Sequence, residues 1–269
     1  MLRNIRIPKK RNVFCDLSRI QRLTIDAVMY FIAVLANKNV RVQTSGNEPF
    51  KASSRKLLRD SGFYRYVKAR NFNSIQRTNH NILQIRSGNK NIPKIVKEVC
   101  DFVNEACGTG LEFTKDLYRI VHEMMSKTVQ HAYENKSKLR NNWYIFVEIR
   151  YNILKFVFLD TGEGIPDTIR KKAFEDLYKG DSQFIYSALK GEYRTRTGEI
   201  FRGRGLPCIY SKYKDGFIEN LRILSCHGNC AFNSPSDEPI LMNMNNSISG
   251  TLFYWEIKKR GKQNVDQSL

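Results

Sequence analysis

The chain has 269 residues, of which 41% are hydrophobic and 12% aromatic, which excludes a disordered chain and allows one large domain or two ordinary ones. Its 45 Lys and Arg residues against 26 Asp and Glu give a net charge of +19, which favours anions such as nucleotides, nucleic acid and acidic surfaces. The basic residues are scattered and are not interleaved with aromatic residues as in a nucleic-acid-binding motif, so solvated lysines are the simpler interpretation.

Targeting and cysteine signals are weak. The segment 1–12 carries charges without an apolar core, so we expect no signal peptide, and the longest apolar run, 27–36, is too short to span a membrane. The six cysteines indicate neither a disulfide framework nor a zinc module, and we expect Cys226 and Cys230 to flank a Gly-Asn hairpin turn. These features predict a reduced, cytoplasmic protein without a membrane partner.

The first 67 residues alternate between strand and helix patterns. The expected elements are strands at 12–18 and 39–46 and helices at 24–38 and 53–67. Such alternation favours a small α/β domain over 1–67. The polar segment 68–93 has no strong period and predicts a linker with room for one short element.

The rest of the chain, 94–269, is predicted to form a second α/β domain. The expected elements are helices at 94–107 and 111–135 and strands at 143–150, 154–160, 220–225 and 250–258. A short turn, 151–153, joins the first two of these strands. The polar segment 167–202 predicts a long loop, and a loop of that length in a compact domain is usually functional.

Four short motifs follow one another in this second part. They are Glu123 on a helix, DTGEGIP (160–166) at a strand end, GRGLP (203–207) after the long loop, and Gly250-Thr251 at the start of the last strand. Each is weak by itself, because short glycine patterns arise often by chance, and DTGEGIP alone is compatible with an ordinary turn. Their order and context give them weight.

Together the motifs resemble the GHKL family, the ATP-binding fold shared by histidine kinases, gyrase-type ATPases, Hsp90-like chaperones and anti-sigma-factor serine kinases. The matching positions are Glu123, His131, Ala132, Asp160, Gly162, Gly164, Ile165, Gly203, Gly205, Leu206, Gly250 and Thr251. The resemblance covers about 94–258. It implies a two-layer α/β sandwich of the Bergerat type over 94–269, with ATP or ADP as the ligand.

The resemblance also implies roles on the side of the base. Asp160 would accept a hydrogen bond from the exocyclic amine of adenine. Gly162 and Gly164 would let the backbone pass close to the base, because they have no Cβ. Thr251 would form a hydrogen bond near the base.

On the phosphate side, Gly203 to Gly205 would place free backbone N–H groups at a helix N-terminus, which is a ready phosphate site. Arg204 and the basic segment 167–202 would cover the phosphates as a lid. Glu123 would orient or deprotonate an attacking water.

Two positions depart from the family pattern. Lys127 stands where the family has its magnesium-binding Asn, and an ammonium group offers donors but no acceptor for a cation. Lys127 forms either an ordinary i,i+4 pair with Glu123, worth roughly 0.2–0.5 kcal/mol, or a direct contact with the phosphates in the metal's place. Both alternatives predict weak or altered magnesium-dependent hydrolysis, and we assign no metal ligand. Pro207, where a further glycine is usual, removes one N–H from the phosphate site.

The N-terminal 67 residues resemble a STAS-type domain, the fold of anti-sigma-factor antagonists. The resemblance is carried by 12–18, 24–31 and 57–67. In phosphorylatable members a serine follows the aspartate of the motif, whereas Ala27 follows Asp26 here. No phosphoacceptor is therefore expected at that position.

The leading hypothesis is an adenine-nucleotide-binding switch with a protein partner and with weak or altered ATP hydrolysis. One alternative is an anti-sigma-type serine/threonine protein kinase, which would transfer labelled phosphate to a partner. Another is a basic nucleic-acid-binding module with a degenerate nucleotide site, which would bind DNA or RNA with steep salt dependence and show no thermal shift with ATP. Whether the protein is an enzyme stays open between these hypotheses.

Overall fold

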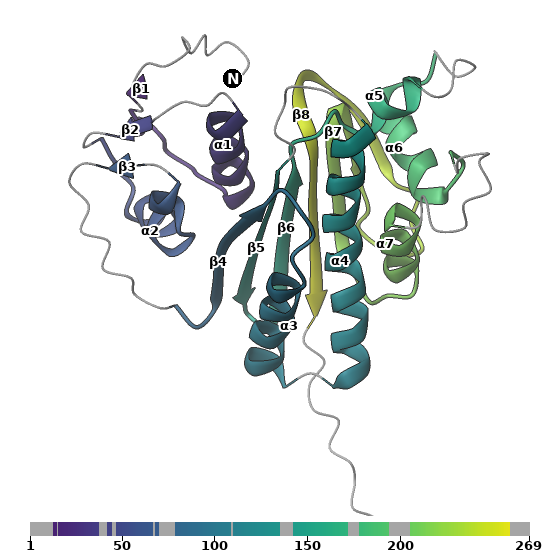
Figure 1. Cartoon of the computed structure of the whole chain (residues 1–269), viewed down its shortest axis with the longest axis horizontal. Coiled ribbons are helices and arrows are strands. Elements are labelled where there is room, and N and C mark those ends of the chain that lie inside the picture. The colour runs from purple at the N-terminus through teal and green to yellow at the C-terminus, as the bar shows by residue number, and fades with distance from the viewer. Residues whose placement is uncertain are drawn as a thin grey trace, which may run out of the picture.

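The computed structural model describes residues 13–14, 16–37, 42–44, 47–66, 68–69, 79–108, 110–134, 142–171, 178–193 and 205–258. These residues form a mixed α/β fold (Figure 1) with seven α-helices, a five-stranded sheet and a small three-stranded sheet. The helices are α1 (Ile25–Asn37), α2 (Ala52–Asp60), α3 (Pro93–Cys107), α4 (Leu111–Glu134), α5 (Ile165–Arg170), α6 (Asp181–Lys190) and α7 (Gly205–Lys214), with a 3-10 turn η2 (Phe63–Arg65). The strands are β1 (Val13–Phe14), β2 (Val42–Thr44), β3 (Lys68–Ala69), β4 (Ile82–Gly88), β5 (Trp143–Arg150), β6 (Ile153–Asp160), β7 (Glu219–Ala231) and β8 (Ile240–Lys258).

The large sheet has the strand order β4-β5-β6-β8-β7, and every neighbouring pair is antiparallel. A two-residue turn, Tyr151–Asn152, joins β5 to β6, and both residues have positive φ angles of 51° and 62°. Positive φ at both central positions is typical of the type I′ turn, whose twist matches that of the flanking strands. The expected strands 143–150 and 154–160 are confirmed with this short connection.

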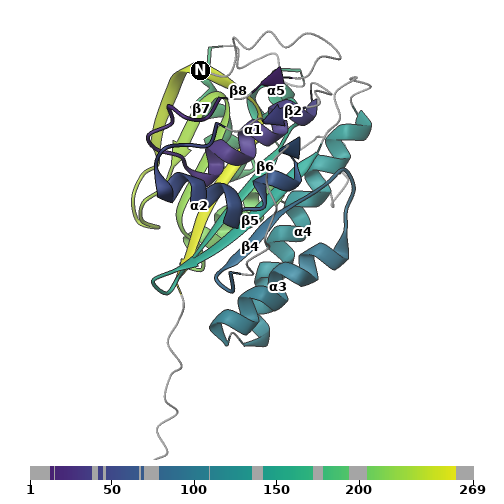
Figure 2. The ribbon, with the colours of Figure 1, turned by 90° about the vertical axis from the view of Figure 1, so that its left-hand side faces the viewer.

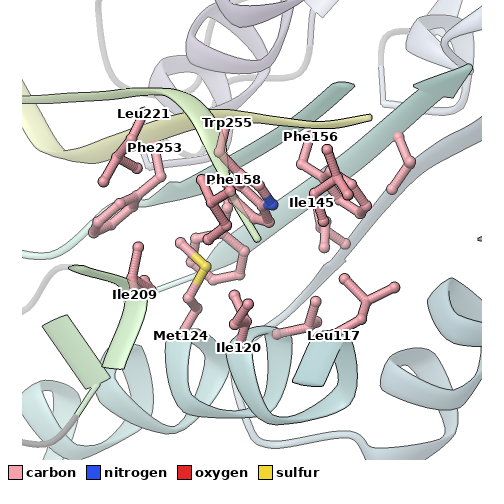
Figure 3. Close-up of a cluster of buried hydrophobic side chains, with 14 of the residues drawn as sticks. Leu117, Ile120, Met124, Ile145, Phe156, Phe158, Ile209, Leu221, Phe253 and Trp255 are labelled. Carbon is pink, nitrogen blue, oxygen red and sulfur yellow. The ribbon is translucent and has the colours of Figure 1, made fainter. Parts of the chain in front are cut away.

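One face of the sheet packs against α3, α4, α6 and α7. Alternate residues of the strands point to this face and are fully buried, as a period of two requires. Figure 3 shows Phe156, Phe158 and Trp255 directed from the sheet toward α4, and Phe156 and Trp255 stack with ring centroids 4.9 Å apart. Leu117 and Ile120 of α4 are completely buried beneath them.

The opposite face of the sheet packs against α1. Val28, Met29 and Ile32 of α1 are buried in one cluster with Phe146 of β5 and Val157 of β6. Figures 1 and 2 show α1 and α2 on the side of the sheet opposite to α3 and α4. The helices of the N-terminal region therefore share a hydrophobic core with the large sheet.

The N-terminal region also contains the small sheet, in which β1, β2 and β3 are parallel. The alternating strand and helix pattern expected over 1–67 is found in the described residues as β1, α1, β2 and α2. The apolar run 27–36 lies within α1. Among the described residues no helix is both long enough and apolar enough to cross a bilayer.

The fold specifies one sequence expectation and corrects two. The segment expected as a linker with room for one short element contributes β4, an edge strand paired with β5, in which Leu83 and Ile85 are buried. The segment expected as a long loop contains α6, whose residues Phe184, Ile185 and Leu189 are completely buried. Polar residues around these short apolar groups hide both elements from a search for periodicity.

The second correction concerns the Gly-Asn turn expected between Cys226 and Cys230, which does not exist. Strand β7 continues through this segment and pairs with the start of β8. A bulge begins at Cys226, which has a φ of 51°. Gly228 is needed for a different reason, since a Cβ there would lie 2.8 Å from the carbonyl oxygen of Asp181 on α6. This glycine thus serves the close approach of a helix, whereas a turn was expected.

Candidate functional site

A row of four side chains crosses one end of the large sheet. Trp143 of β5 pairs with Asp160 of β6, Asp160 pairs with Thr251 of β8, and Thr251 pairs with Ser225 of β7. The residues two positions before or after them along the strands, such as Phe158, belong to the core beneath α4 and α7. Because side chains two apart share a face, the row points to the same helices. Asp160 and Thr251, which come from separate sequence motifs, thus lie side by side.

The DTGEGIP segment turns back over this end of the sheet. The backbone N–H of Gly162 donates a hydrogen bond of 2.9 Å to Asp160 Oδ1, so the carboxylate shapes its own turn. Gly164 has a φ of 97°, and a Cβ there would lie 2.7 Å from Cys226 Sγ and 2.9 Å from Ser225 Oγ. The glycine at 164 therefore allows close packing on β7, in addition to any approach to a ligand.

The glycine of the Gly-Thr motif is required by the same packing. Gly250 has a φ of 85°, a conformation that is costly for any residue with a Cβ. A Cβ there would also lie 2.0 Å from the carbonyl oxygen of Asp160. Only glycine lets β8 approach β6 closely enough to set Thr251 beside Asp160.

Helices α4 and α7 run antiparallel beside each other on this face. Lys212 Nζ of α7 and Asp116 Oδ2 of α4 form a salt bridge of 2.8 Å. Gly205 lies seven positions before Lys212, and Glu123 lies seven positions after Asp116. Because the two helices are antiparallel and have the same rise per residue, Glu123 is about level with the first turn of α7. In Figure 1 the C-terminal end of α4 lies at the end of the sheet that carries α5.

The electrostatics of Cys208 are consistent with this arrangement of α4 and α7. Burial raises the pKa of the Cys208 thiol, the charge of Arg119 lowers it, and the charge of Glu123 raises it. Both charged residues belong to α4, so the first turns of α7 lie beside this part of that helix. Leu206, in the first turn of α7, packs partly buried against the main core.

Several predicted site residues lie partly or wholly outside the part of the chain that the structure describes. Gly203 and Arg204 lie outside the described residues. Lys127 and His131 are part of α4, about one and two turns beyond Glu123, but their side chains are also outside the described part. The alternatives for Lys127 therefore stay open. Within the described residues no three or more His, Cys, Asp or Glu side chains are grouped to hold a metal ion.

Ser225 was not predicted from the sequence. It is fully buried, and its hydroxyl oxygen accepts a hydrogen bond of 2.9 Å from the Ile165 N–H. It also lies 3.0 Å from the carbonyl oxygen of Gly250 and 3.0 Å from Thr251 Oγ1. Only the register of β7 on β8 reveals this position, since in the sequence Ser225 is simply the last residue of an expected strand.

A buried ion pair holds the elements that follow the row. Asp181, at the start of α6, is 6% exposed, pairs with Arg170 of α5 and accepts a 2.7 Å hydrogen bond from the His227 N–H of β7. His227 Nδ1 in turn lies 2.9 Å from the carbonyl oxygen of Met244. The helices between the DTGEGIP and GRGLP motifs are therefore tied to the edge of the sheet.

A small pocket of about 250 Å³ lies at the other end of the sheet. It is lined by Phe113, Gly216, Phe217, Glu219, Ile257 and Lys258. Lys258 pairs with Ile153 at the start of β6, whereas Asp160 ends that strand. Glu219 and Lys258 already form a salt bridge of 2.9 Å, so the pocket offers no convergent polar groups and is not the candidate site.

Comparisons with known proteins give no independent identification. No model of a protein family matches the chain, and no curated protein matches it. We therefore infer function from the motifs and from the geometry described above.

Proposed function

We propose that the chain is an adenine-nucleotide-binding protein of the GHKL type, which acts as a nucleotide-controlled switch with weak or altered ATP hydrolysis. The observation that carries the proposal is the pairing of Asp160 with Thr251 at the end of the sheet, on the face that packs against α4 and α7. In this proposal the large sheet with α3, α4 and α7 is the Bergerat-type sandwich, and the N-terminal region is STAS-like.

The base is proposed to bind over the row. A carboxylate and a hydroxyl side by side offer hydrogen-bond acceptors to an exocyclic amine, and Asp160 adds negative charge that strengthens such a bond. Gly162 keeps the backbone next to Asp160 free of a side chain. The buried, apolar Phe158 and Phe253 lie below the row and form a dry floor.

The phosphates are proposed to bind at the N-terminus of α7. Unpaired backbone N–H groups and the helix dipole favour an anion there, and the net charge of +19 attracts one. Glu123, level with this turn, is positioned to orient a water molecule toward bound phosphate. Bound ATP supplies the phosphoanhydride bond, and this chain supplies the groups that orient the water.

Magnesium fits the described residues less well than the nucleotide. A magnesium ion is usually held by one or two carboxylates together with phosphates and waters, and the sequence has Lys127 in place of the expected Asn ligand. Binding with slow turnover follows from this donor set. A switch of this kind needs a protein partner. We propose that nucleotide binding changes the surface offered to this partner through α5 and α6, which the ion pair between Arg170 and Asp181 joins.

Calorimetric titration of the purified chain with ATP, ADP and GTP, each with and without magnesium, tests this proposal. We expect binding of ATP and ADP that exceeds binding of GTP and depends little on magnesium. Absence of binding to all three nucleotides, with steep salt-dependent binding to DNA or RNA, contradicts it and favours the nucleic-acid-binding alternative. Transfer of labelled phosphate to a partner protein favours the kinase alternative.

A further inference from the structure

Ser225 makes three hydrogen-bond contacts in a fully buried position. It accepts the Ile165 N–H at 2.9 Å, it lies 3.0 Å from the Gly250 carbonyl oxygen, and it lies 3.0 Å from Thr251 Oγ1. These partners belong to α5 and to the Gly-Thr motif of β8. A buried side chain with this many partners fixes both segments relative to each other.

The directions of these hydrogen bonds follow from counting protons. A carbonyl oxygen can only accept, so Ser225 must donate its single hydroxyl hydrogen to Gly250. The Ile165 N–H is already a donor to Ser225. The remaining contact then requires Thr251 to be the donor, because Ser225 has no second hydrogen. Thr251 Oγ1 is left with lone pairs and no free hydrogen.

The consequence is that, among the described residues, Asp160 and Thr251 both present acceptors at this end of the site. Asp160 offers carboxylate oxygens, and Thr251, its partner across the strands, offers hydroxyl lone pairs. Side chains opposite each other in an antiparallel pair have Cβ atoms about 5 Å apart. Two acceptors bonded at about 2.9 Å to the two hydrogens of one amino group are also about 5 Å apart. Neighbouring side chains on paired strands are thus close enough for both to accept from one exocyclic –NH₂ group.

We infer that Ser225 is a positioning residue that determines base specificity, because it holds the Thr251 hydroxyl as an acceptor and so selects 6-amino purines over 6-oxo purines. The inference rests on the proposed nucleotide site and adds to it the residue that sets the selectivity between 6-amino and 6-oxo bases. A 6-oxo group would face two acceptors with no hydrogen to share, and both would stay unsatisfied. Thr251 is only 2% exposed, so the inference requires the amino group of the base to reach the floor of the site.

The test compares calorimetric affinities for ATP and for inosine triphosphate, whose base carries a 6-oxo group. For the unchanged chain we expect ATP to bind at least about tenfold more tightly. In Ser225→Ala the Thr251 hydrogen becomes free to donate to an oxo group, so the ratio should fall several-fold. In Thr251→Val the ratio should also fall, while the contacts of Ser225 to Ile165 and Gly250 stay in place.

The double variant shows whether Ser225 acts through Thr251. Its affinity ratio should equal that of Thr251→Val alone, because Ser225 has nothing left to orient. Ser54→Ala removes another buried serine, on α2, and should leave the ratio unchanged. Thermal unfolding of each variant verifies that it is folded.

Different outcomes separate the inference from the proposal beneath it. If ATP binds but Ser225→Ala and Thr251→Val keep the original ratio, or weaken both nucleotides equally, Ser225 is only structural and the inference is overturned. If Ser225→Ala does not fold, Thr251→Val decides by itself, since an unchanged ratio overturns the inference. If the unchanged chain binds neither nucleotide, the proposed function fails and the inference fails with it.

Discussion

Replacing Gly250 with alanine should be among the most destabilising single changes in the chain. A φ of 85° costs a residue with a Cβ about 1–2 kcal/mol. The new Cβ would lie 2.0 Å from the Asp160 carbonyl oxygen, so β8 or β6 has to move by about 1 Å, and such overpacking typically costs about 1–3 kcal/mol. Together these effects predict a loss of roughly 2–5 kcal/mol in the free energy of unfolding.

Urea unfolding measures this loss, and the chain offers a matched control. Gly108 also has a positive φ, of 59°, but a Cβ there meets nothing within 4 Å. Gly108→Ala should therefore cost only the conformational part, about 1 kcal/mol. If Gly250→Ala costs no more than Gly108→Ala, β8 does not approach Asp160 as described, and the explanation of the Gly-Thr motif is wrong.

Three other changes have defined outcomes. Tyr151→Asn should raise the free energy of unfolding by about 0.5–1 kcal/mol in urea, because Asn tolerates the positive φ of a type I′ turn better than Tyr, and a loss of stability contradicts this. Burial raises the pKa of Cys226 and of Cys230 to about 12, so iodoacetamide at pH 8 should modify them only in the unfolded chain. Both thiols ionise near pH 9 in the unfolded chain but only near pH 12 in the folded chain, so their contribution to the free energy of unfolding is fully present below pH 9 and is lost as the pH rises toward 12. Urea titrations at pH 8 and 10 measure this loss. Lys127→Asn should bring magnesium-dependent phosphate release in a colorimetric assay, and no release would mean that Lys127 is not what limits hydrolysis.

Much of the fold was predictable because its apolar residues follow clear periods. The long helices and the β5–β6 hairpin were found within a few residues of their ends. The short element expected within 68–93 could not be identified as a strand, because the register of β4 on β5 shifts between Leu83 and Arg86 and breaks the alternation. Helix α6 was not predicted, because its buried face has only a few apolar residues among polar neighbours. The prediction of a Gly-Asn turn was wrong because Gly228 is needed for close packing against α6, a helix that is distant in the sequence.

The residues of the candidate site that belong to sequence motifs were predictable, whereas the contacts between strands that complete the site were not. The glycines and the acid of DTGEGIP indicate a special strand end, and the order of the motifs places Asp160 and Thr251 in one site. That Ser225 completes the row depends on how β7 pairs with β8 across a bulge, and no local pattern reports such a register. The nucleotide itself stays a prediction.

Calorimetric titration of Asp160→Asn with ATP tests the central claim most directly. Asparagine keeps an oxygen for the Gly162 N–H, so the turn should persist, but its charge is lost and its –NH₂ can face the amine of the base. A hydrogen bond to a charged group contributes about 1.5–3 kcal/mol, so ATP should bind roughly 10- to 100-fold more weakly, while the exposed control Asp215→Asn binds as the unchanged chain does. An Asp160→Asn chain that is folded and binds ATP with undiminished affinity would contradict the account.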